Sequence, residues 1–169
     1  TTFSDTTAVW PTQSQDSEQL QSSGISPFET LNRTPGIETR GSLSKGSPAI
    51  TIRGSAKASR TLLLYDGVPL NLSDGIGAQE FLIPREALAS AQILKGPASV
   101  YYGASAMAGG VNFVPEFYTR SRLRVSGGSF KQKGVFGAAS FMNDERHQLQ
   151  VTGFNESIDG DYPYYSPTS

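Results

Sequence analysis

Short apolar runs separated by turn residues dominate the chain from residue 49 to 114. Residues 50–53 (ITIR) alternate apolar and polar side chains, which is the period-two pattern of a strand. The run 61–65 (TLLLY) is continuously apolar and stops at Asp66-Gly67, a tight-turn dipeptide that predicts a hairpin with the residues that follow. We expect two further strands at AQILKG (91–96) and VNFV (111–114).

Helical signals are few and short. SEQLQSSG (17–24) predicts one or two turns, with Asp16 or Ser17 as N-cap and Gly24 as the stop. SPFETLNRTPG (26–36) predicts a second short helix that begins at Pro27 and ends at Pro35-Gly36. IPREALAS (83–90) predicts a third. The segment 36–48, rich in glycine and serine, is expected to be a loop, and residues 1–14 a short strand or a tether.

Four glycines interrupt small and aromatic residues in the segment AQILKGPASVYYGASAMAGGVNFV: Gly96, Gly103, Gly109 and Gly110. Glycine reaches backbone angles that other residues adopt only with strain. We therefore expect the chain to turn sharply here while it stays closely packed.

The pattern changes near residues 117–120. Beyond this point apolar and polar residues alternate strictly, as in RLRV (122–125) and QLQVT (148–152). Three antiparallel strands are expected, joined at 127–129 and 143–145, which gives turns roughly every ten to twelve residues. We predict a first domain at 1–119 and a strand region at 120–169. Such alternation is the weak signature of a transmembrane barrel, but it also fits three strands of a soluble sandwich.

Composition excludes several function classes. The chain has 169 residues, no cysteine, one histidine and a net charge of -1, so neither a nucleic-acid partner nor a thiolate or histidine metal site is indicated. Asp66, Glu80 and Ser99 lack the neighbours that catalysis requires, so we expect no enzyme and no cofactor bound by the chain. No spanning helix or signal peptide is recognisable, and His147 is expected to be an exposed strand residue.

Five segments occur in an order and spacing that resemble the plug domain of TonB-dependent outer-membrane receptors. They are LNRTPGIETRG, ITIRG, LLLYDGVPL, the long segment IPREALASAQILKGPASVYYGASAMAGGVNFV, and the alternating strands after it. The resemblance covers residues from about Glu18 to Val114, with the start of the barrel beyond. It implies an α+β plug domain with a small mixed sheet, followed by the first antiparallel strands of a transmembrane β-barrel. The plug would fill a barrel of about 22 strands, nearly all of which lies outside this chain.

The resemblance also implies roles for basic residues and for turns. The positions of Arg53 and Lys95 are basic in the family and pair with glutamates of the barrel interior. Lysine replaces the usual arginine at 95, which loses bidentate geometry. Two solvated surface cations are the alternative. The glycines would let the backbone fold tightly where a side chain would strike the barrel wall, with Asp66 and Gly67 forming a turn.

Ligand contacts in the family come from apical loops. Here the candidates are Arg40, Lys57, Gln79 and Phe81. The N-terminal segment Asp5, Thr6, Thr7, Ala8 and Val9 resembles a TonB box, although TTAVW also fits the first plug strand.

The function that the resemblance implies is a receptor in the bacterial outer membrane. Its plug would gate active uptake of a scarce ligand such as a ferric siderophore, with haem, cobalamin or a sugar as other cargoes. The expected partners are TonB with its inner-membrane energising complex, the remaining barrel, a small-molecule ligand and outer-membrane lipid. The alternative is a soluble β-rich binding module that grips a partner protein.

Overall fold

The computed structural model describes residues 12–21, 27–40, 49–55, 60–70, 83–97, 99–128, 131–143 and 148–157. The chain forms two compact units, Thr1–Glu116 and Phe117–Ser169. This division lies beside the change of pattern that the sequence shows near residues 117–120.

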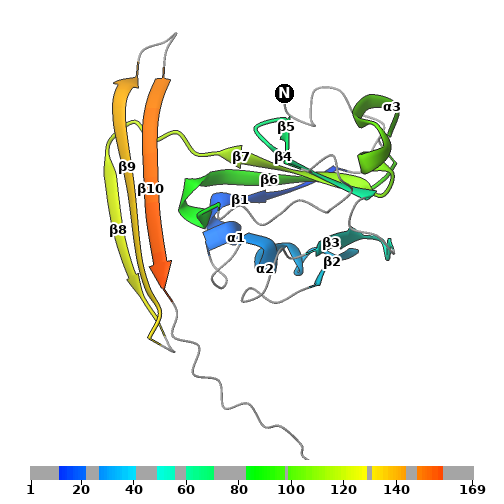
Figure 1. Ribbon diagram of the computed structural model, residues 1–169, viewed down its shortest axis with the longest axis horizontal. Coiled ribbons are helices and arrows are strands. Elements are labelled where there is room, and N and C mark those ends of the chain that lie inside the picture. The colour runs from blue at the N-terminus through cyan, green and yellow to red at the C-terminus, as the bar shows by residue number, and fades with distance from the viewer. Residues whose placement is uncertain are drawn as a thin grey trace, which may run out of the picture. The chain divides into compact units, whose positions relative to one another are not determined.

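The first unit is built on a mixed five-stranded sheet (Figure 1). Its strand order is β1-β6-β7-β4-β5, with β4 parallel to β7 and all other neighbours antiparallel. The strands are β1 (Thr12–Asp16), β4 (Thr61–Tyr65), β5 (Val68–Pro69), β6 (Leu88–Leu94) and β7 (Gly109–Pro115). The expected hairpin at Asp66-Gly67 joins β4 to β5.

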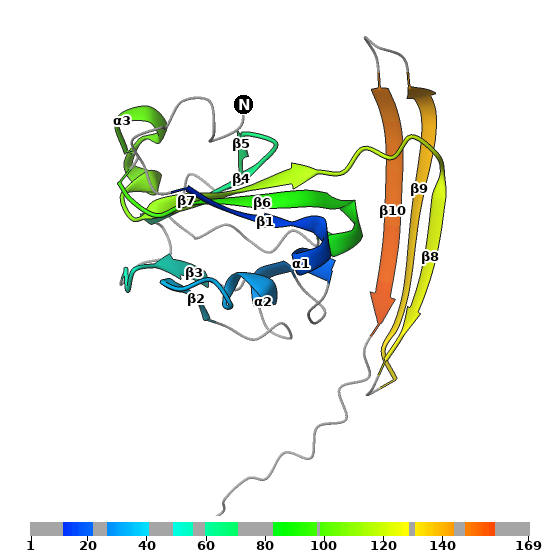
Figure 2. The same cartoon turned by 180° about the vertical axis from the view of Figure 1, so that it is seen from behind.

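One face of this sheet is covered by two short helices and a separate two-stranded ribbon, as both views show (Figures 1 and 2). The helices are α1 (Ser17–Gln21) and α2 (Pro27–Leu31), and the ribbon pairs β2 (Ile37–Arg40) with β3 (Ala49–Ile52). The core beneath them joins Leu20, Phe28, Leu31, Ile37, Ile50 and Ile52 to Leu63, Ala91, Ile93, Val111 and Phe113 of the sheet. Phe28 meets Phe113 edge to face, with ring centroids 5.4 Å apart.

The other face of the sheet has a smaller core. Leu62, Leu64 and Leu94 pack there with Ala106, and Tyr102 packs against them. Tyr102 ends helix α3 (Ser99–Tyr102), and Ala106 ends the 3₁₀ helix η3 (Ala104–Ala106). Because β4 is buried on both faces, its sequence is a continuous apolar run and does not alternate.

Three predictions for this unit were wrong or incomplete. Ile37–Arg40, expected in a loop, is strand β2, stabilised by pairing with β3. The expected helix at 83–90 is only the 3₁₀ helix η2 (Arg85–Ala87), and Leu88 already begins β6 between two antiparallel neighbours. The short strand or tether expected at residues 1–14 is incomplete as a prediction: strand β1 begins at Thr12 and runs on to Asp16, and the polar sequence TQSQD does not reveal its pairing with β6. Helix α1 begins as predicted, with Oδ1 of Asp16 accepting the N–H of Gln19 at 2.9 Å.

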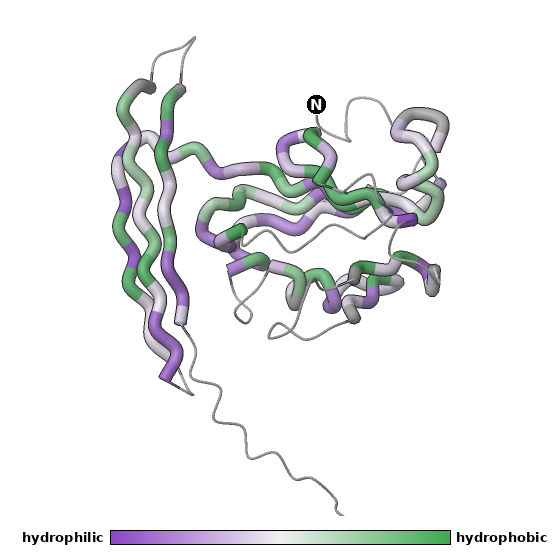
Figure 3. Tube along the Cα trace, in the orientation of Figure 1, coloured by the Kyte–Doolittle hydropathy of each residue, from purple (hydrophilic) through white to green (hydrophobic). Residues whose placement is uncertain are grey.

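The second unit is a three-stranded antiparallel sheet in the order β10-β9-β8. The strands are β8 (Arg122–Gly127), β9 (Lys133–Asn143) and β10 (Gln148–Ser157), close to the expected positions. Hydropathy alternates along β8, whereas β9 is apolar or nearly neutral over most of its length (Figure 3). Large apolar side chains are exposed on one face: Leu123, Val125, Val135, Phe141, Leu149 and Val151. None of the helices in the described part of the chain has the length and apolar character that crossing a membrane requires.

Candidate functional site

Three segments of the first unit meet at Gly109, the first residue of β7. Its φ is +131°, and a Cβ built on it would lie 2.2 Å from the carbonyl oxygen of Leu94. The same Cβ would lie 3.2 Å from Cδ1 of Ile52 and 3.3 Å from the nitrogen of Gly96. The unit's own strands therefore already close the space around Gly109, and exclusion of a side chain by a barrel wall stays a prediction.

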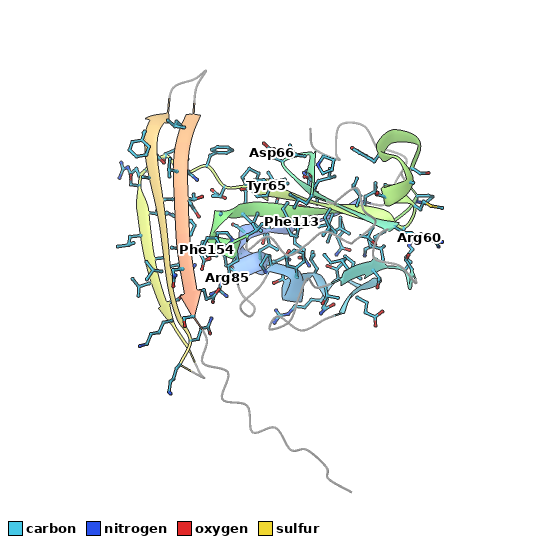
Figure 4. The ribbon with its side chains drawn as sticks, in the orientation of Figure 1. Arg60, Tyr65, Asp66, Arg85, Phe113 and Phe154 are labelled. Carbon is cyan, nitrogen blue, oxygen red and sulfur yellow. The ribbon has the colours of Figure 1, made fainter. Side chains whose placement is uncertain are left out.

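A basic residue flanks each segment that converges on Gly109. Arg53 follows Ile52 at the end of β3, Lys95 follows Leu94 at the end of β6, and Arg60 precedes Thr61, whose Cα partner is Gly109. Figure 4 labels Arg60 at one end of β4 and Asp66 at the other. We call Arg53, Arg60 and Lys95 the basic end of the unit.

Arg53 is exposed and is held by an unusual turn. Arg53 and Gly54 have φ values of 52° and 71°, and the N–H of Ser55 donates to the carbonyl oxygen of Ile52 at 3.1 Å. Two successive positive φ angles closed by such a bond are typical of a type I′ turn. The Arg53 N–H also donates to the oxygen of Gly36 at 2.7 Å, so the backbone beneath the guanidinium is fixed.

Lys95 is partly buried and has a polar partner. Its Nζ donates to Oε1 of Gln13 in β1 at 2.7 Å. Burial lowers the pKa of Lys95 below its ordinary value, and repulsion from Arg53 lowers it further. The structure thus brings the two predicted cations into one electrostatic site. The sequence did not predict Gln13, because a polar residue before the first helix carries no signal for this contact.

Within the described residues, none of the three cations of the basic end forms an ion pair. A salt bridge elsewhere in the unit joins the adjacent residues Arg85 and Glu86, whose Nε and Oε1 atoms lie 3.2 Å apart. Clustered positive charge attracts an incoming anion, and such an anion would raise the lowered pKa of Lys95.

The Asp66-Gly67 turn is anchored to β7. Asp66 and Gly67 have φ values of 50° and 79°, and the Asp66 N–H donates to the oxygen of Phe113 at 2.9 Å. The Gly67 N–H donates to Oδ1 of buried Asn112 at 3.0 Å, and Nδ2 of Asn112 donates to Gln92. Burial raises the pKa of Tyr65, and the Asp66 carboxylate adds to the rise. The sequence signal that could have predicted this hydrogen-bond network is Asn112, a single polar residue in the apolar strand VNFV.

The other predicted turn glycines differ among themselves. Gly103 has a φ of 76° and caps η3, so its conformation requires glycine. Gly96 lies in a bend after β6 and is not among the described residues with positive φ. Gly110 lies inside β7, opposite Leu62 and Leu94, so the turn expected there is wrong: sheet pairing on both sides holds it extended.

Most predicted ligand-binding residues lie outside the described part of the chain. Arg40 is the last residue of β2, opposite Ala49. Lys57, Gln79 and Phe81 fall outside the described ranges, as do Asp5, Thr6, Thr7, Ala8 and Val9 of the possible TonB box. The described ranges contain no group of three or more acidic or histidine side chains that could hold a metal ion.

The family of the chain follows from its sequence. Residues 5–110 match the model of the family described as the TonB-dependent receptor plug domain. The chain belongs to this family. The matched residues run from before β1 to the first two residues of β7 and include the helices and the basic end. The plug is an α+β unit on a small mixed sheet, as expected.

Individual relatives agree with this assignment. The chain is 34% identical over 101 residues to the vitamin B12 transporter BtuB of Vibrio vulnificus, and the match covers 59% of this chain and 16% of that protein. The ferric yersiniabactin uptake receptor FyuA from Yersinia pestis has a similar fold, with 22% identity, a TM-score of 0.66, and coverage of 86% of this chain and 24% of that one.

The siderophore receptor PirA from Pseudomonas aeruginosa is also similar in fold. The identity is 21% and the TM-score 0.63, over 89% of this chain and 28% of PirA. The structural matches to FyuA and PirA cover more of this chain than the first unit alone and therefore include part of the second unit. The chain thus spans a small part of the length of each relative.

Proposed function

We propose that this chain is the plug and the first barrel strands of a TonB-dependent outer-membrane receptor that takes up a scarce ligand such as a ferric siderophore. The observation that carries the proposal is the order of two units: a plug domain is followed directly by a sheet with an apolar face exposed. A plug requires an enclosing wall, and such a sheet supplies its beginning.

The exposed face of the second unit supports a membrane location. Leu123 and Val125 are 77% and 73% exposed, and Phe141 and Val151 are 66% and 57% exposed. An apolar band of this kind on alternate strand positions faces lipid in an outer-membrane barrel, and the intervening polar positions face the lumen. A water-soluble sandwich would instead cover the band with a second sheet.

The basic end supports plugging of that barrel. In the proposed receptor, carboxylates of the barrel wall pair with Arg53 and Lys95, and these ion pairs hold the plug in the lumen. The ammonium group of Lys95 is a single point charge, so its ion pair with a wall carboxylate breaks easily, whereas the guanidinium group of Arg53 can bind a carboxylate through two hydrogen bonds. TonB binds the N-terminal segment and pulls, which loosens these contacts and opens a path. The proposal includes no catalytic step and no cofactor held by the chain.

The relatives support two ligand classes. The named sequence relative is a vitamin B12 transporter, and the named structural neighbours are receptors for siderophores. We propose a ferric siderophore as the first candidate ligand and vitamin B12 as the second.

Uptake by the complete receptor tests the proposal. The receptor is produced in a bacterial strain that lacks its own siderophore and vitamin B12 receptors, and uptake of iron-55 chelates and of labelled vitamin B12 is measured with and without TonB. TonB-dependent accumulation of an iron chelate is the expected result. Accumulation of vitamin B12 alone would show that the ligand is vitamin B12 and not a siderophore. Recovery of the protein in the soluble fraction with no uptake would favour the binding-module alternative.

A further inference from the structure

Tyr118, just after the plug, is held on both sides by side chains of the three-stranded sheet. Its N–H donates to Oε1 of Gln150 at 2.7 Å, and its carbonyl oxygen accepts from Oγ of Ser140 at 2.5 Å. Gln150 and Ser140 are Cα partners in neighbouring strands. The segment that leads into β8 is therefore fixed across two strands before β8 begins.

The Tyr118 ring makes two further contacts within the same unit. It meets the Phe136 ring at a centroid distance of 6.4 Å and an interplanar angle of 68°. Cζ of Arg122 lies 4.6 Å from the Tyr118 ring centroid. An edge contact between rings and a guanidinium over a ring face are both attractive geometries. Phe136 is only 5% exposed, so the ring contact lies in a buried place.

All these partners lie on one face of the sheet. Arg122 is opposite Ala138, and Gln150 is opposite Ser140, so their side chains share a face. Phe136 lies two residues from Ala138 in β9, so its side chain is on the same face of the sheet. The apolar residues Leu123 and Val125 alternate with this set and point the other way. The anchor is thus on the polar face, which faces the lumen in the proposed barrel.

We propose that Tyr118 is a positioning residue that fixes the linker between plug and barrel on the polar face of β8–β10, so that movement of the plug during transport ends before residue 118. That the plug moves rests on the proposed function, whereas the anchor rests on the contacts. The hydrogen bonds and ring contacts described above converge on one residue, so the linker leaves the sheet only when these contacts break together.

A spin label on the neighbouring residue tests the anchor in the resting receptor. The chain has no native cysteine, and Thr119 is exposed, so a nitroxide attached at Thr119→Cys reports the mobility of the linker through its EPR line shape. Adding Tyr118→Ala is expected to raise the mobile fraction of the label about tenfold through loss of the two ring contacts. Tyr118→Phe keeps both ring contacts, so the label should stay mostly immobile. A parent-like line shape in the Tyr118→Ala receptor would overturn the proposal.

A second variant keeps the test decisive where Tyr118→Ala fails to assemble. Gln150→Leu removes the acceptor of the Tyr118 N–H but leaves the ring in place, and it too should raise the mobile fraction of the label. The spectrum of the labelled receptor is also recorded in energised cells and in cells whose proton gradient is collapsed. Equal line shapes are expected, and a more mobile label in energised cells would show that the linker moves. Uptake in the same cells reports separately on the proposed function.

Discussion

Lys95 Nζ lies 2.7 Å from Oε1 of Gln13, so a side-chain hydrogen bond joins the end of β6 to the edge strand β1. The Cα partner of Gln13 is Ile93, two residues before Lys95, which places both polar groups on the same face of the sheet. Through this hydrogen bond, β1, the most N-terminal described strand, is attached to the basic end of the unit.

The first prediction concerns the charge on Lys95. Because Arg53 contributes to the lowered pKa of Lys95, Arg53→Gln should raise that pKa toward its ordinary value. The pH titration of the dimethylated Lys95 signal, assigned with Lys95→Gln, measures the change. Arg60→Gln is the matched control, since it removes another cation of the same end. An equal shift in both variants would contradict the electrostatic relationship between Arg53 and Lys95.

This relationship has a defined effect on stability. The folded pKa of Lys95 lies below the unfolded one, so folding disfavours the protonated form. The penalty is fully present below the folded pKa and disappears as the pH rises through the unfolded pKa. A carboxylate from the barrel wall would reverse the sign, because it raises the pKa of Lys95. A raised pKa in the complete receptor is therefore expected if the proposed ion pair forms.

The second prediction separates steric from backbone effects at glycine. Gly109→Ala combines a positive φ with a clash against the Leu94 carbonyl and should cost about 4 kcal/mol or more of plug stability. Gly103→Ala has a positive φ but open space, and should cost about 1–3 kcal/mol. Hydrogen exchange of the β6–β7 amides within the receptor measures both. Equal costs would mean that contact with Leu94 is unimportant.

The third prediction tests which face of the second unit meets lipid. Val151→Lys places a charge on the apolar face and should destabilise the inserted barrel by about 2–4 kcal/mol near the membrane centre. Thr152→Lys, one residue along, places the same charge on the polar face and should be tolerated. Folding yields into lipid vesicles compare the two. Similar losses for both variants would argue against a lipid-facing band.

The sequence predicted the elements whose pattern depends on local periodicity. The strands around Ile50–Ile52 and Thr61–Tyr65, and those after Phe117, were found because burial on one or both faces fixes the residue types. Asp16 as N-cap of α1 and the turn at Asp66-Gly67 follow from local chemistry in the same way.

The elements that were missed depend on partners distant in sequence. LASAQIL was expected to be partly helical, since alanine and leucine favour helices, but its position between β1 and β7 makes it a strand. β1 lacks the apolar alternation of a strand because its buried position is occupied by Gln15, whose Nε2 donates to Oγ1 of Thr34 at 2.6 Å. Of the site, the two cations were predicted, but Gln13 and Tyr118 required the register of the sheets.

The central claim is that this plug closes a barrel and that the pull on the N-terminal segment detaches β1, the first described strand, from β6 during uptake, so a disulfide between these two strands is the most direct test. Ser14 and Gln92 are Cα partners in β1 and β6, a spacing that a disulfide can bridge, and the chain has no other cysteine. Ser14→Cys combined with Gln92→Cys therefore ties β1 to the sheet. Gln92→Cys alone controls for loss of the hydrogen bond from Asn112.

The decisive measurement is TonB-dependent uptake by the oxidised double variant, compared with ligand binding by the same cells. The account predicts normal binding, uptake reduced to the level without TonB, and recovery of uptake after a reductant opens the disulfide. Uptake at the wild-type rate with the disulfide fully formed would contradict it.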